Sequence, residues 1–260
     1  MEFHPEVAHT ARMYDWYLGG QDNYEADRIA GEQALRAHPN LRLTARCNRD
    51  FMHRAVRFLA EQGIEQFLDI GTGIPTEPNL HQVVQEVNPA ARVVYADNDP
   101  LVLTHARALL TGTSEGRTAY LNADLRQPDS ILSDPKLTET LDLSAPTALS
   151  VISILHFIED PDDPQGTIAK LMGALPAGSY LAMTHATPDF GPEMGEVERV
   201  YHEAGLPGQI RTREEVARFF DGLEWVEPGL TTPHRWRPPI DPPEVMDNQV
   251  QFYAGVARKV

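Results

Sequence analysis

The sequence is poor in cysteine and has no long hydrophobic run. Its only cysteine among 260 residues is Cys47, so no internal disulfide can form. The surrounding residues 45–49 are typical of a helix and not of a turn that exposes a nucleophile, which indicates a small apolar filler at this position. No apolar stretch is long enough to cross a bilayer, and no basic and then apolar leader opens the chain. We therefore expect a cytoplasmic protein.

Basic residues are also scarce. The chain has 22 Lys and Arg residues against 38 Asp and Glu residues, which gives a formal net charge of -16 at pH 7. This charge repels phosphate backbones at long range, so a nucleic-acid partner is disfavoured. No His, Cys and Asp cluster has metal-ligand spacing, and no internal repeat or low-complexity tract stands out. The length suits one α/β domain with a modest extension.

Apolar strand-like segments alternate with segments of helical length over most of the chain. The expected strands are residues 66–70, 93–97, 118–121, 148–155, 179–184, 223–226 and 249–256. The expected helices between the first five strands are residues 79–87, 101–110 and 167–175. This alternation predicts a parallel, doubly wound α/β sheet.

Two helix starts can be read directly. Asp163 followed by Pro164 is typical of an N-cap and a first helical position, so the acidic run at 160–164 is interpreted as a loop and cap and not as a metal site. Thr212 and Glu215 have the spacing of a capping box.

The turn after the first expected strand is the most informative motif. Gly71 and Gly73 allow a sharp turn and leave no side chain between the backbone and a ligand. The second expected strand ends on Asp97, whose carboxylate can accept hydrogen bonds from ribose hydroxyls. A ligand-free tight turn is the alternative, and the spaced Asp97 makes it the less favoured one. The pattern predicts a nucleoside site at the tips of the first two strands.

The residues after the glycine turn indicate which nucleoside is bound. A dinucleotide site needs a third glycine and free helix N–H groups for the pyrophosphate, but Thr76 stands at that glycine position. Glu77 and Pro78 follow, so one N–H donor is missing and a negative charge occupies the place of a phosphate. This weakens the case for a nicotinamide oxidoreductase. It favours S-adenosylmethionine, a nucleoside without phosphates.

The whole pattern resembles the bacterial S-adenosyl methyltransferase family that was formerly catalogued as a domain of unknown function. The resemblance runs from about Ala11 to the C-terminus. The segments that carry it are Tyr14 to Tyr24, Ala45 to Arg49, Phe67 to Thr76, Tyr95 to Pro100, Ala106 to Leu110, Leu155-His156 and Arg213 to Gly222. It implies a Rossmann-like class I methyltransferase fold with a seven-stranded, mostly parallel sheet whose last strand is antiparallel and lies between its neighbours. It also implies a helical cap over residues 1–62, a cofactor-binding domain over 63–260, and bound S-adenosylmethionine, which leaves as S-adenosylhomocysteine.

The resemblance also implies the residues that contact the cofactor. Those expected at the methionine part are Asp69, Gly71, Thr72 and Gly73. Asp97 is expected at the ribose, and Asn98, Asp124 and Leu125 are expected at the adenine. For Asp124 a helix N-cap is an equally good interpretation. Arg46 and Asn48 are expected to reach the cofactor carboxylate. Pro75 departs from the glycine that is frequent in this loop, and it stiffens the turn.

The amino-terminal aromatic residues are expected to fold over the carboxyl edge of the sheet. Tyr14, Trp16 and Tyr17 precede Gly19-Gly20, and aromatic faces attract a sulfonium as they attract other cations. The glycine pair offers a hinge for a lid that excludes water. The alternative is a helix face that only docks the cap. Tyr14 is therefore a candidate cofactor contact, and Tyr17 a candidate catalytic residue.

Methyl transfer needs alignment first and a base only where the acceptor loses a proton. His156 and His185 follow the fourth and fifth expected strands, with His156 preferred, although a packed histidine is the alternative at both positions. Asp241-Pro242-Pro243-Glu244 lacks the aromatic residue of amino-directed DNA methyltransferases and is interpreted as a loop. A small molecule is the expected acceptor, with a protein side chain as a further possibility. A non-catalytic sensor of S-adenosylmethionine or its product is the alternative function.

Overall fold

The computed structural model describes residues 4–102, 104, 112–242 and 244–260. These residues form a seven-stranded sheet in the order β3-β2-β1-β4-β5-β7-β6. The strands are β1 Gln66–Ile70, β2 Arg92–Asp97, β3 Arg117–Asn122, β4 Ala148–Val151, β5 Tyr180–Ala186, β6 Leu223–Trp225 and β7 Phe252–Lys259. Strands β1 to β5 pair in parallel, whereas β7 runs antiparallel between β5 and β6. The predicted mostly parallel sheet with an antiparallel last strand is confirmed.

The strand boundaries differ most from the sequence prediction in β4 and β7. β4 ends at Val151 and not at residue 155, because Ser153 adopts a positive φ of 57° and its N–H donates to Thr184 Oγ1 at 2.8 Å. The short 3-10 helix η1 (Leu155–Phe157) then follows. β7 begins at residue 252 and not at 249, since a helical turn precedes it.

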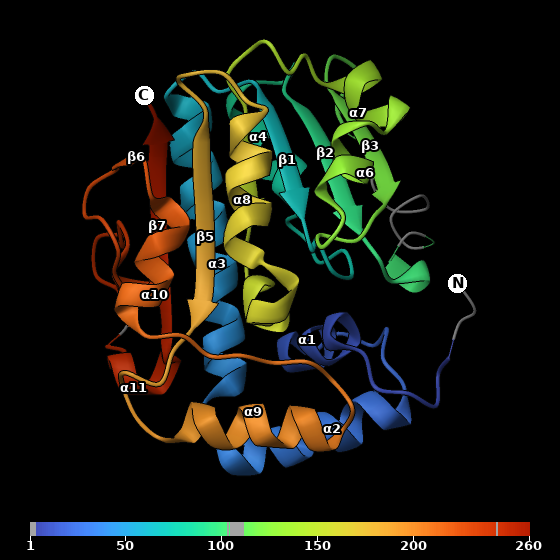
Figure 1. Ribbon diagram of the computed structural model, residues 1–260, viewed down its shortest axis with the longest axis vertical. Helices are drawn as coiled ribbons and strands as arrows, with labels where there is room; N and C mark the ends of the chain where they lie inside the picture. Colours follow the sequence, from blue (N-terminus) through green and yellow to red (C-terminus); the bar gives the residue numbers. More distant parts are fainter. Residues whose placement is uncertain (1–3, 103, 105–111, 243) are drawn as a thin grey trace.

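Helices flank both faces of the sheet and cover its carboxyl edge (Figure 1). They are α1 Thr10–Leu18, α2 Glu25–Ala37, α3 Leu41–Glu61, α4 Leu80–Val87, α6 Pro128–Leu132, α7 Pro135–Thr140, α8 Pro164–Gly173, α9 Glu193–Glu203, α10 Arg213–Ala217 and α11 Asp247–Val250. Further 3-10 helices are η2 Asp160–Asp162, η3 Arg218–Phe220 and η4 Pro233–Arg235. The helix expected at 101–110 falls largely outside the described residues, as does position 243 of the loop at 241–244.

Both predicted helix caps are confirmed. The Asp163 carboxylate accepts from the Gly166 N–H at 2.9 Å, and Pro164 is the first residue of α8. The Thr212 N–H donates to Glu215 Oε2 at 2.8 Å, which completes the capping box of α10. These contacts satisfy backbone N–H groups that a helix start leaves unpaired.

The core has one apolar cluster on each face of the sheet. Successive residues of a strand point to opposite faces, so Leu68 of β1 packs in one cluster with α8 while its neighbour Phe67 packs in the other. In that second cluster Phe51 and Leu59 of α3 cover the strands. Strands that are buried on both faces explain the almost continuous apolar runs in the sequence.

A third apolar cluster joins the layer of helices below the carboxyl ends of the parallel strands (Figure 1). It contains Met13 of α1, Ala34 of α2 and Val197 of α9. Because α9 follows β5, the cap is built from two distant stretches of chain and not from the amino-terminal block alone. The first half of α3 also joins this cluster, so the division expected at residue 62 falls at the end of a helix shared by cap and sheet.

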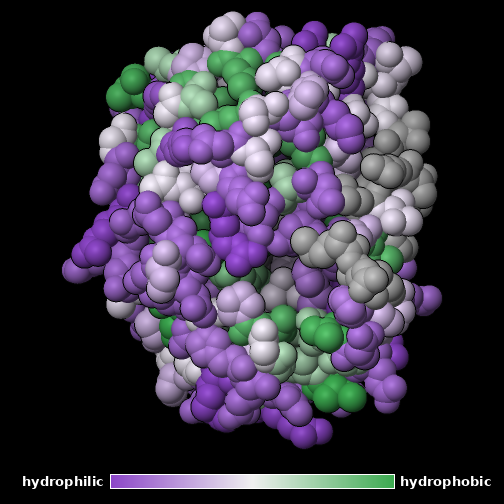
Figure 2. Space-filling model, turned by 45° about the vertical axis from the view of Figure 1, so that its right-hand side comes forward, coloured by the Kyte–Doolittle hydropathy of each residue, from purple (hydrophilic) through white to green (hydrophobic). Residues whose placement is uncertain are grey.

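One face of the molecule is mostly hydrophilic. Figure 2 shows hydrophilic residues over most of this face, with hydrophobic residues in its upper and lower parts. Within the described part of the chain, no helix combines the length and apolar character that crossing a membrane requires.

Candidate active site

A cavity of about 360 Å³ lies between the carboxyl ends of the strands and the cap helices. Loops that follow β1, β2, β3 and β4 form one side, and α1, α3 and α9 form the other. The predicted site residues that line it are Tyr14, Tyr17, Asn48, Asp69, Gly71, Thr72, Gly73, Asp97, Asn98, Asp124, Leu125 and His156. Arg46 and His185 do not line it. The tertiary structure therefore gathers residues from six separated segments at one place.

The glycine turn after β1 has the geometry that glycine alone adopts easily. Gly71 and Gly73 have positive φ angles of 72° and 67°. A Cβ on Gly71 would lie 2.6 Å from the Ile154 side chain, so close packing also requires glycine there. A Cβ on Gly73 would meet nothing within 4 Å, which shows that its backbone borders open space. The turn thus presents bare main chain to the cavity.

Asp97 is buried at the end of β2 and braces this turn. Its Oδ2 atom accepts from the Gly73 N–H at 2.9 Å, and its Oδ1 atom accepts from the Asp99 N–H at 2.9 Å. Burial raises the pKa of Asp97, and these two hydrogen bonds oppose that shift. Each carboxylate oxygen keeps acceptor capacity toward the cavity.

Asp69, at the end of β1, is a second buried carboxyl on the cavity wall. Burial raises its pKa to about 6, against the lowering effects of the Ser150 hydroxyl, the Arg49 charge and the Thr72 hydroxyl. A buried acid of this kind is suited to pairing with a cationic amino group.

The basic residue that α3 directs toward the cavity is Arg49 and not Arg46. Its guanidinium donates to the carbonyls of Thr76 and, at 2.8 Å, of Pro78 in the loop after β1. Arg49 lies four residues after Ala45 and three before Met52, and all three line the cavity, whereas Arg46 is exposed and does not line it. The sequence carried this signal, because the apolar spacing of 41–60 defines the buried face.

Asn48 lies beside Arg49 on the same wall. It is fully buried, and neither atom of its amide has a hydrogen-bond partner among the described residues. Unpaired buried amides are costly, which indicates that a bound group satisfies this one.

The loop after β3 brings Asp124 and Leu125 to the cavity beside Asn98. Asp124 accepts from the Arg126 N–H at 2.9 Å and from Arg126 Nε at 3.0 Å. The hydrogen bond from Arg126 is the main cause that lowers the pKa of Asp124. The alternative interpretation of Asp124 as a helix N-cap is wrong, since Gln127 occupies that position before α6.

The aromatic residues of α1 divide between cavity and surface. The Tyr14 hydroxyl donates to the Ala45 carbonyl at 3.0 Å, and the Tyr17 hydroxyl lies 3.2 Å from that of Tyr201 in α9. Both rings line the cavity, whereas Trp16 does not and packs under the Arg42 guanidinium, whose Cζ is 4.3 Å from the ring centroid. The aromatic group therefore serves both the cavity and the docking of the cap.

Local packing and backbone conformation explain why glycine occupies both positions at the end of α1. Gly19 closes the helix with a positive φ of 88°. A Cβ on Gly20 would overlap Asp15, whose carboxylate accepts from the Asp22 N–H at 3.0 Å. These contacts account for the glycine pair without a hinge.

Of the two candidate bases, the structure brings only His156 to the cavity. Burial and the nearby His185 and Arg211 hold the pKa of His156 well below its ordinary value, so the ring is neutral at pH 7. Its Nδ1 atom is buried and has no partner among the described residues.

His185 is fully buried away from the cavity, and it lies within β5, which runs to Ala186, and not after the strand as predicted. Its Nδ1 lies 2.7 Å from the Ala186 carbonyl, and its Nε2 lies 2.9 Å from the Arg211 guanidinium. With both ring nitrogens occupied and a pKa lowered to about 3 mainly by burial, it positions Arg211 and is a packed residue.

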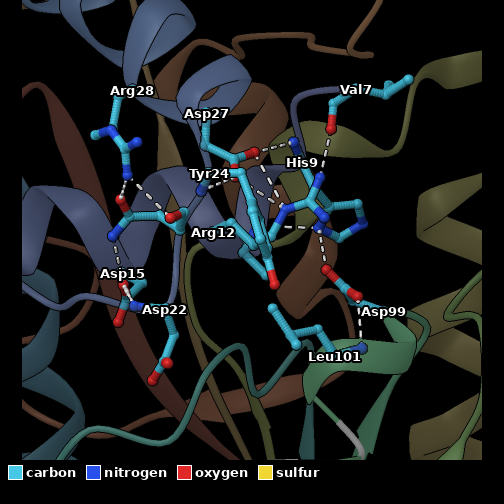
Figure 3. A network of polar contacts seen from close by, with 12 residues as sticks. Val7, His9, Arg12, Asp15, Asp22, Tyr24, Asp27, Arg28, Asp99 and Leu101 are labelled. Atoms are coloured by element: carbon cyan, nitrogen blue, oxygen red, sulfur yellow. Dashed lines mark hydrogen bonds and ion pairs between the residues drawn. The ribbon is translucent and has the colours of Figure 1, made fainter. Parts of the chain in front are cut away.

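A buried polar network fixes the cap to the end of β2 (Figure 3). The Asp27 carboxylate accepts from the N–H groups of His9 and Tyr24, both at 2.8 Å, and pairs with Arg12 at 3.1 Å. His9 Nδ1 in turn lies 3.1 Å from Asp99 Oδ2. One carboxylate therefore joins the starts of α1 and α2, and His9 connects both to the loop after β2.

Among the described residues, no group of three or more His, Cys, Asp or Glu side chains is arranged to hold a metal ion.

The sequence pattern of the S-adenosyl methyltransferase family matches residues 2–260. The chain belongs to this family. The methyltransferase is 51% identical to a DUF574 family protein from Streptomyces avermitilis, with 98% of this chain and 99% of that chain covered and a TM-score of 0.96. It is 42% identical to a candidate methyltransferase from Thermobifida fusca, with coverages of 98% and 96% and a TM-score of 0.91.

A more distant structural match supports the fold assignment and nothing further. Human N-acetylserotonin methyltransferase, solved in complex with S-adenosylmethionine, is 14% identical over 98% of this chain and 63% of that one, with a TM-score of 0.51. No curated protein gave a significant match. The methyltransferase has the Rossmann-like class I fold and depends on S-adenosylmethionine. The residues present fit this cofactor, because Gly73 borders open space and the buried Asn48 amide lacks a partner among the described residues.

Proposed function

We propose that this methyltransferase methylates a small molecule enclosed in the cavity between the sheet and the cap. The observation that carries the proposal is a single cavity with a charged half at the strand ends and an apolar half under α9. An acceptor the size of a small molecule fits such an enclosed space, whereas a folded protein surface would have to displace the cap.

The charged half is proposed to hold S-adenosylmethionine. Asp69 would pair with the amino group of its methionine part, and Arg49 with Asn48 would hold the carboxylate, in place of the predicted Arg46. Asp97 would accept from the ribose hydroxyls, while the bare backbone of the glycine turn leaves room for the ligand. In the full assignment the contacts are Tyr14, Asn48, Arg49, Asp69, Gly71, Thr72, Gly73, Asp97, Asn98, Asp124 and Leu125.

When bound, the cofactor supplies a methyl group on a sulfonium sulfur, which an acceptor lone pair takes as the carbon–sulfur bond breaks and S-adenosylhomocysteine is left. The chain's own task is alignment and exclusion of water. Enclosure by α1 and α9 serves both, and such positioning contributes on the order of 7–11 kcal/mol to lowering a barrier. His156 is neutral at pH 7 and would accept a hydrogen bond from an acceptor O–H or N–H and so orient it, with Tyr17 closing the same wall.

Calorimetry tests the proposal and its alternatives. The wild-type protein should bind S-adenosylmethionine and S-adenosylhomocysteine but not NAD. Asp97→Ala should weaken both signals by about 100-fold or more, because two hydrogen bonds to a charged group are lost. Asp129→Ala is the matched control, since Asp129 is 79% exposed and pairs with Lys170 away from the cavity. It should bind like the wild type.

Binding is then followed by a methyl-transfer assay over a broad small-molecule panel with radiolabelled cofactor. Transfer to a panel member supports the proposal. Binding without transfer to any member would favour the non-catalytic sensor, and NAD binding in place of the adenosyl ligands would overturn the cofactor assignment.

A further inference from the structure

The apolar half of the cavity, here called the acceptor chamber, has a composition distinct from the rest. It is defined by Tyr17, Leu41, Met194, Val197, Tyr201 and Phe252. These residues come from α1, α3, α9 and the start of β7, and all of them are buried. They belong to the cap cluster and not to either cluster that flanks the sheet. The chamber is therefore a pocket in the apolar core of the cap.

The walls of the acceptor chamber are rich in aromatic rings. Phe157 stacks on Tyr201 with ring centroids 5.9 Å apart and an interplanar angle of 19°. His156 lies between Phe157 and Phe252, at centroid distances of 4.1 and 5.2 Å. Flat walls of this kind favour a flat, aromatic ligand, since rings gain both area and oriented contacts when they pack together.

None of the six residues that define the chamber carries a charge. Among the described lining residues outside the charged half, Glu198 is the ionisable acid, and its Oε1 atom accepts from the Ile210 N–H at 2.8 Å. Arg211 lies behind the wall and not on it. Its guanidinium donates to the Ile158 carbonyl at 3.0 Å and to Asp160 at 2.7 Å, besides His185. A carboxylate entering the chamber would therefore lose its hydration without gaining a cation, and an ammonium would meet only the Glu198 carboxylate, which already accepts from a backbone N–H, among these lining residues.

His156 supplies the polar contact that remains. A neutral imidazole has one donor and one acceptor nitrogen, so it can receive a hydrogen bond from an uncharged O–H or N–H. The buried, unpartnered Nδ1 atom shows that the protein alone does not satisfy this ring. The hydroxyls of Tyr17 and Tyr201, 3.2 Å apart, already face each other.

We infer that the acceptor is an uncharged aromatic molecule whose O–H or N–H meets His156 inside the acceptor chamber. This inference rests on the proposed function, because it takes the charged half of the cavity to be filled by the cofactor.

Calorimetry on the protein saturated with S-adenosylhomocysteine tests the inference with three probes of one shape. They are 4-phenylphenol, biphenyl-4-carboxylate and 4-phenylbenzylammonium. The neutral phenol should bind at least about tenfold more tightly than either ion. Equal or tighter binding of an ion would overturn the inference, and so would binding of none of the three. Binding of S-adenosylhomocysteine is measured first. If no such binding is seen, the proposed function fails, and this outcome is distinct from a failure of the inference about the acceptor.

A charge placed in the chamber should change the order of preference. Val197→Lys sets an ammonium on the chamber wall and should improve biphenyl-4-carboxylate relative to the phenol by about tenfold. Glu203→Gln changes the net charge by the same amount on the same helix, but its side chain is 61% exposed outside the chamber. It should keep the wild-type order. If Val197→Lys does not fold, the order of the three probes on the wild-type protein still decides the question.

Discussion

At the scale of single residues, burial sets both the stability and the binding behaviour of Asp69. Its pKa of about 6 in the folded protein lies above the ordinary value of 3.8. A raised carboxyl pKa means that the folded state favours the protonated form, so the stability present at low pH is lost as the pH rises through about 6. At the proposed site the cofactor's amino cation would reverse this preference, because a nearby cation favours the ionised form of the carboxyl group.

Asp69→Asn should therefore stabilise the cofactor-free protein while abolishing tight binding. The free energy of unfolding at pH 8 is expected to rise by roughly 1–3 kcal/mol, since the variant has no buried carboxylate to ionise. In the wild type, affinity for S-adenosylmethionine should fall about tenfold per pH unit below the pKa of Asp69. Urea denaturation measures the free energy of unfolding and calorimetry measures the affinity. Both are recorded from pH 5 to 8, a range that spans the pKa of about 6. An affinity for S-adenosylmethionine that does not change with pH in the wild type would contradict the assignment.

The glycine turn allows a matched pair of substitutions. Gly71→Ala combines a positive φ of 72° with a Cβ 2.6 Å from Ile154, and it should lower the free energy of unfolding by roughly 2–4 kcal/mol. Gly73→Ala shares the φ penalty but has open space for the Cβ, so its loss should be about 1–2 kcal/mol. Chemical denaturation compares the two. A larger loss for Gly73→Ala would show that close packing is not the reason for Gly71.

At the scale of elements, short helices depend on their first turn. α10 spans only Arg213–Ala217, too few residues for intrinsic helix propensity to hold it. Its capping box and the packing of Val216 against the sheet cluster hold it beside the β5 end.

Thr212→Ala should cost about 1 kcal/mol in the free energy of unfolding, because the Thr212 hydroxyl no longer contacts the Glu215 carboxylate and N–H group. Thr138→Ala in α7 is the control, since the Thr138 hydroxyl is on an exposed helix surface and donates only to the Pro135 carbonyl. Thermal denaturation distinguishes them. An equal, small shift for both variants would show that the capping box does not stabilise α10.

At the scale of the whole molecule, the cofactor should act as a bridge between the cap and the sheet. The cavity is lined by α1 and α9 on one side and by the strand-end loops on the other, so a ligand there contacts both layers. The Asp27 network makes the same connection in the protein alone.

S-adenosylhomocysteine at 100 times its dissociation constant should stabilise the fold by about 2.7 kcal/mol. Hydrogen exchange should slow most in α1 and α9, which border the cavity, and less in α7, which packs on β2 and β3. Mass spectrometry with and without the ligand reports each helix. Protection confined to the strand-end loops would contradict a bridging role.

The sequence by itself determined the charged half of the site and most of the sheet. Gly71, Gly73 and Asp97 lie within two strand-turn units, and their local backbone preferences and spacing suffice to place them. The alternation of strands and helices likewise indicated the parallel sheet, whereas the antiparallel last strand was implied by the resemblance to the family. Arg49 was within reach of the same reasoning, since the apolar spacing of α3 separates it from Arg46.

Only the tertiary structure decided the acceptor chamber. Tyr17, Val197 and Phe252 are far apart in the chain, and no local pattern says that their helices and strand meet. The same holds for His156 and His185, which the sequence places alike at the ends of neighbouring strands but which have opposite surroundings in the structure. Local chemistry shapes turns and caps, whereas packing between distant segments decides which side chains line a cavity and which are buried behind it.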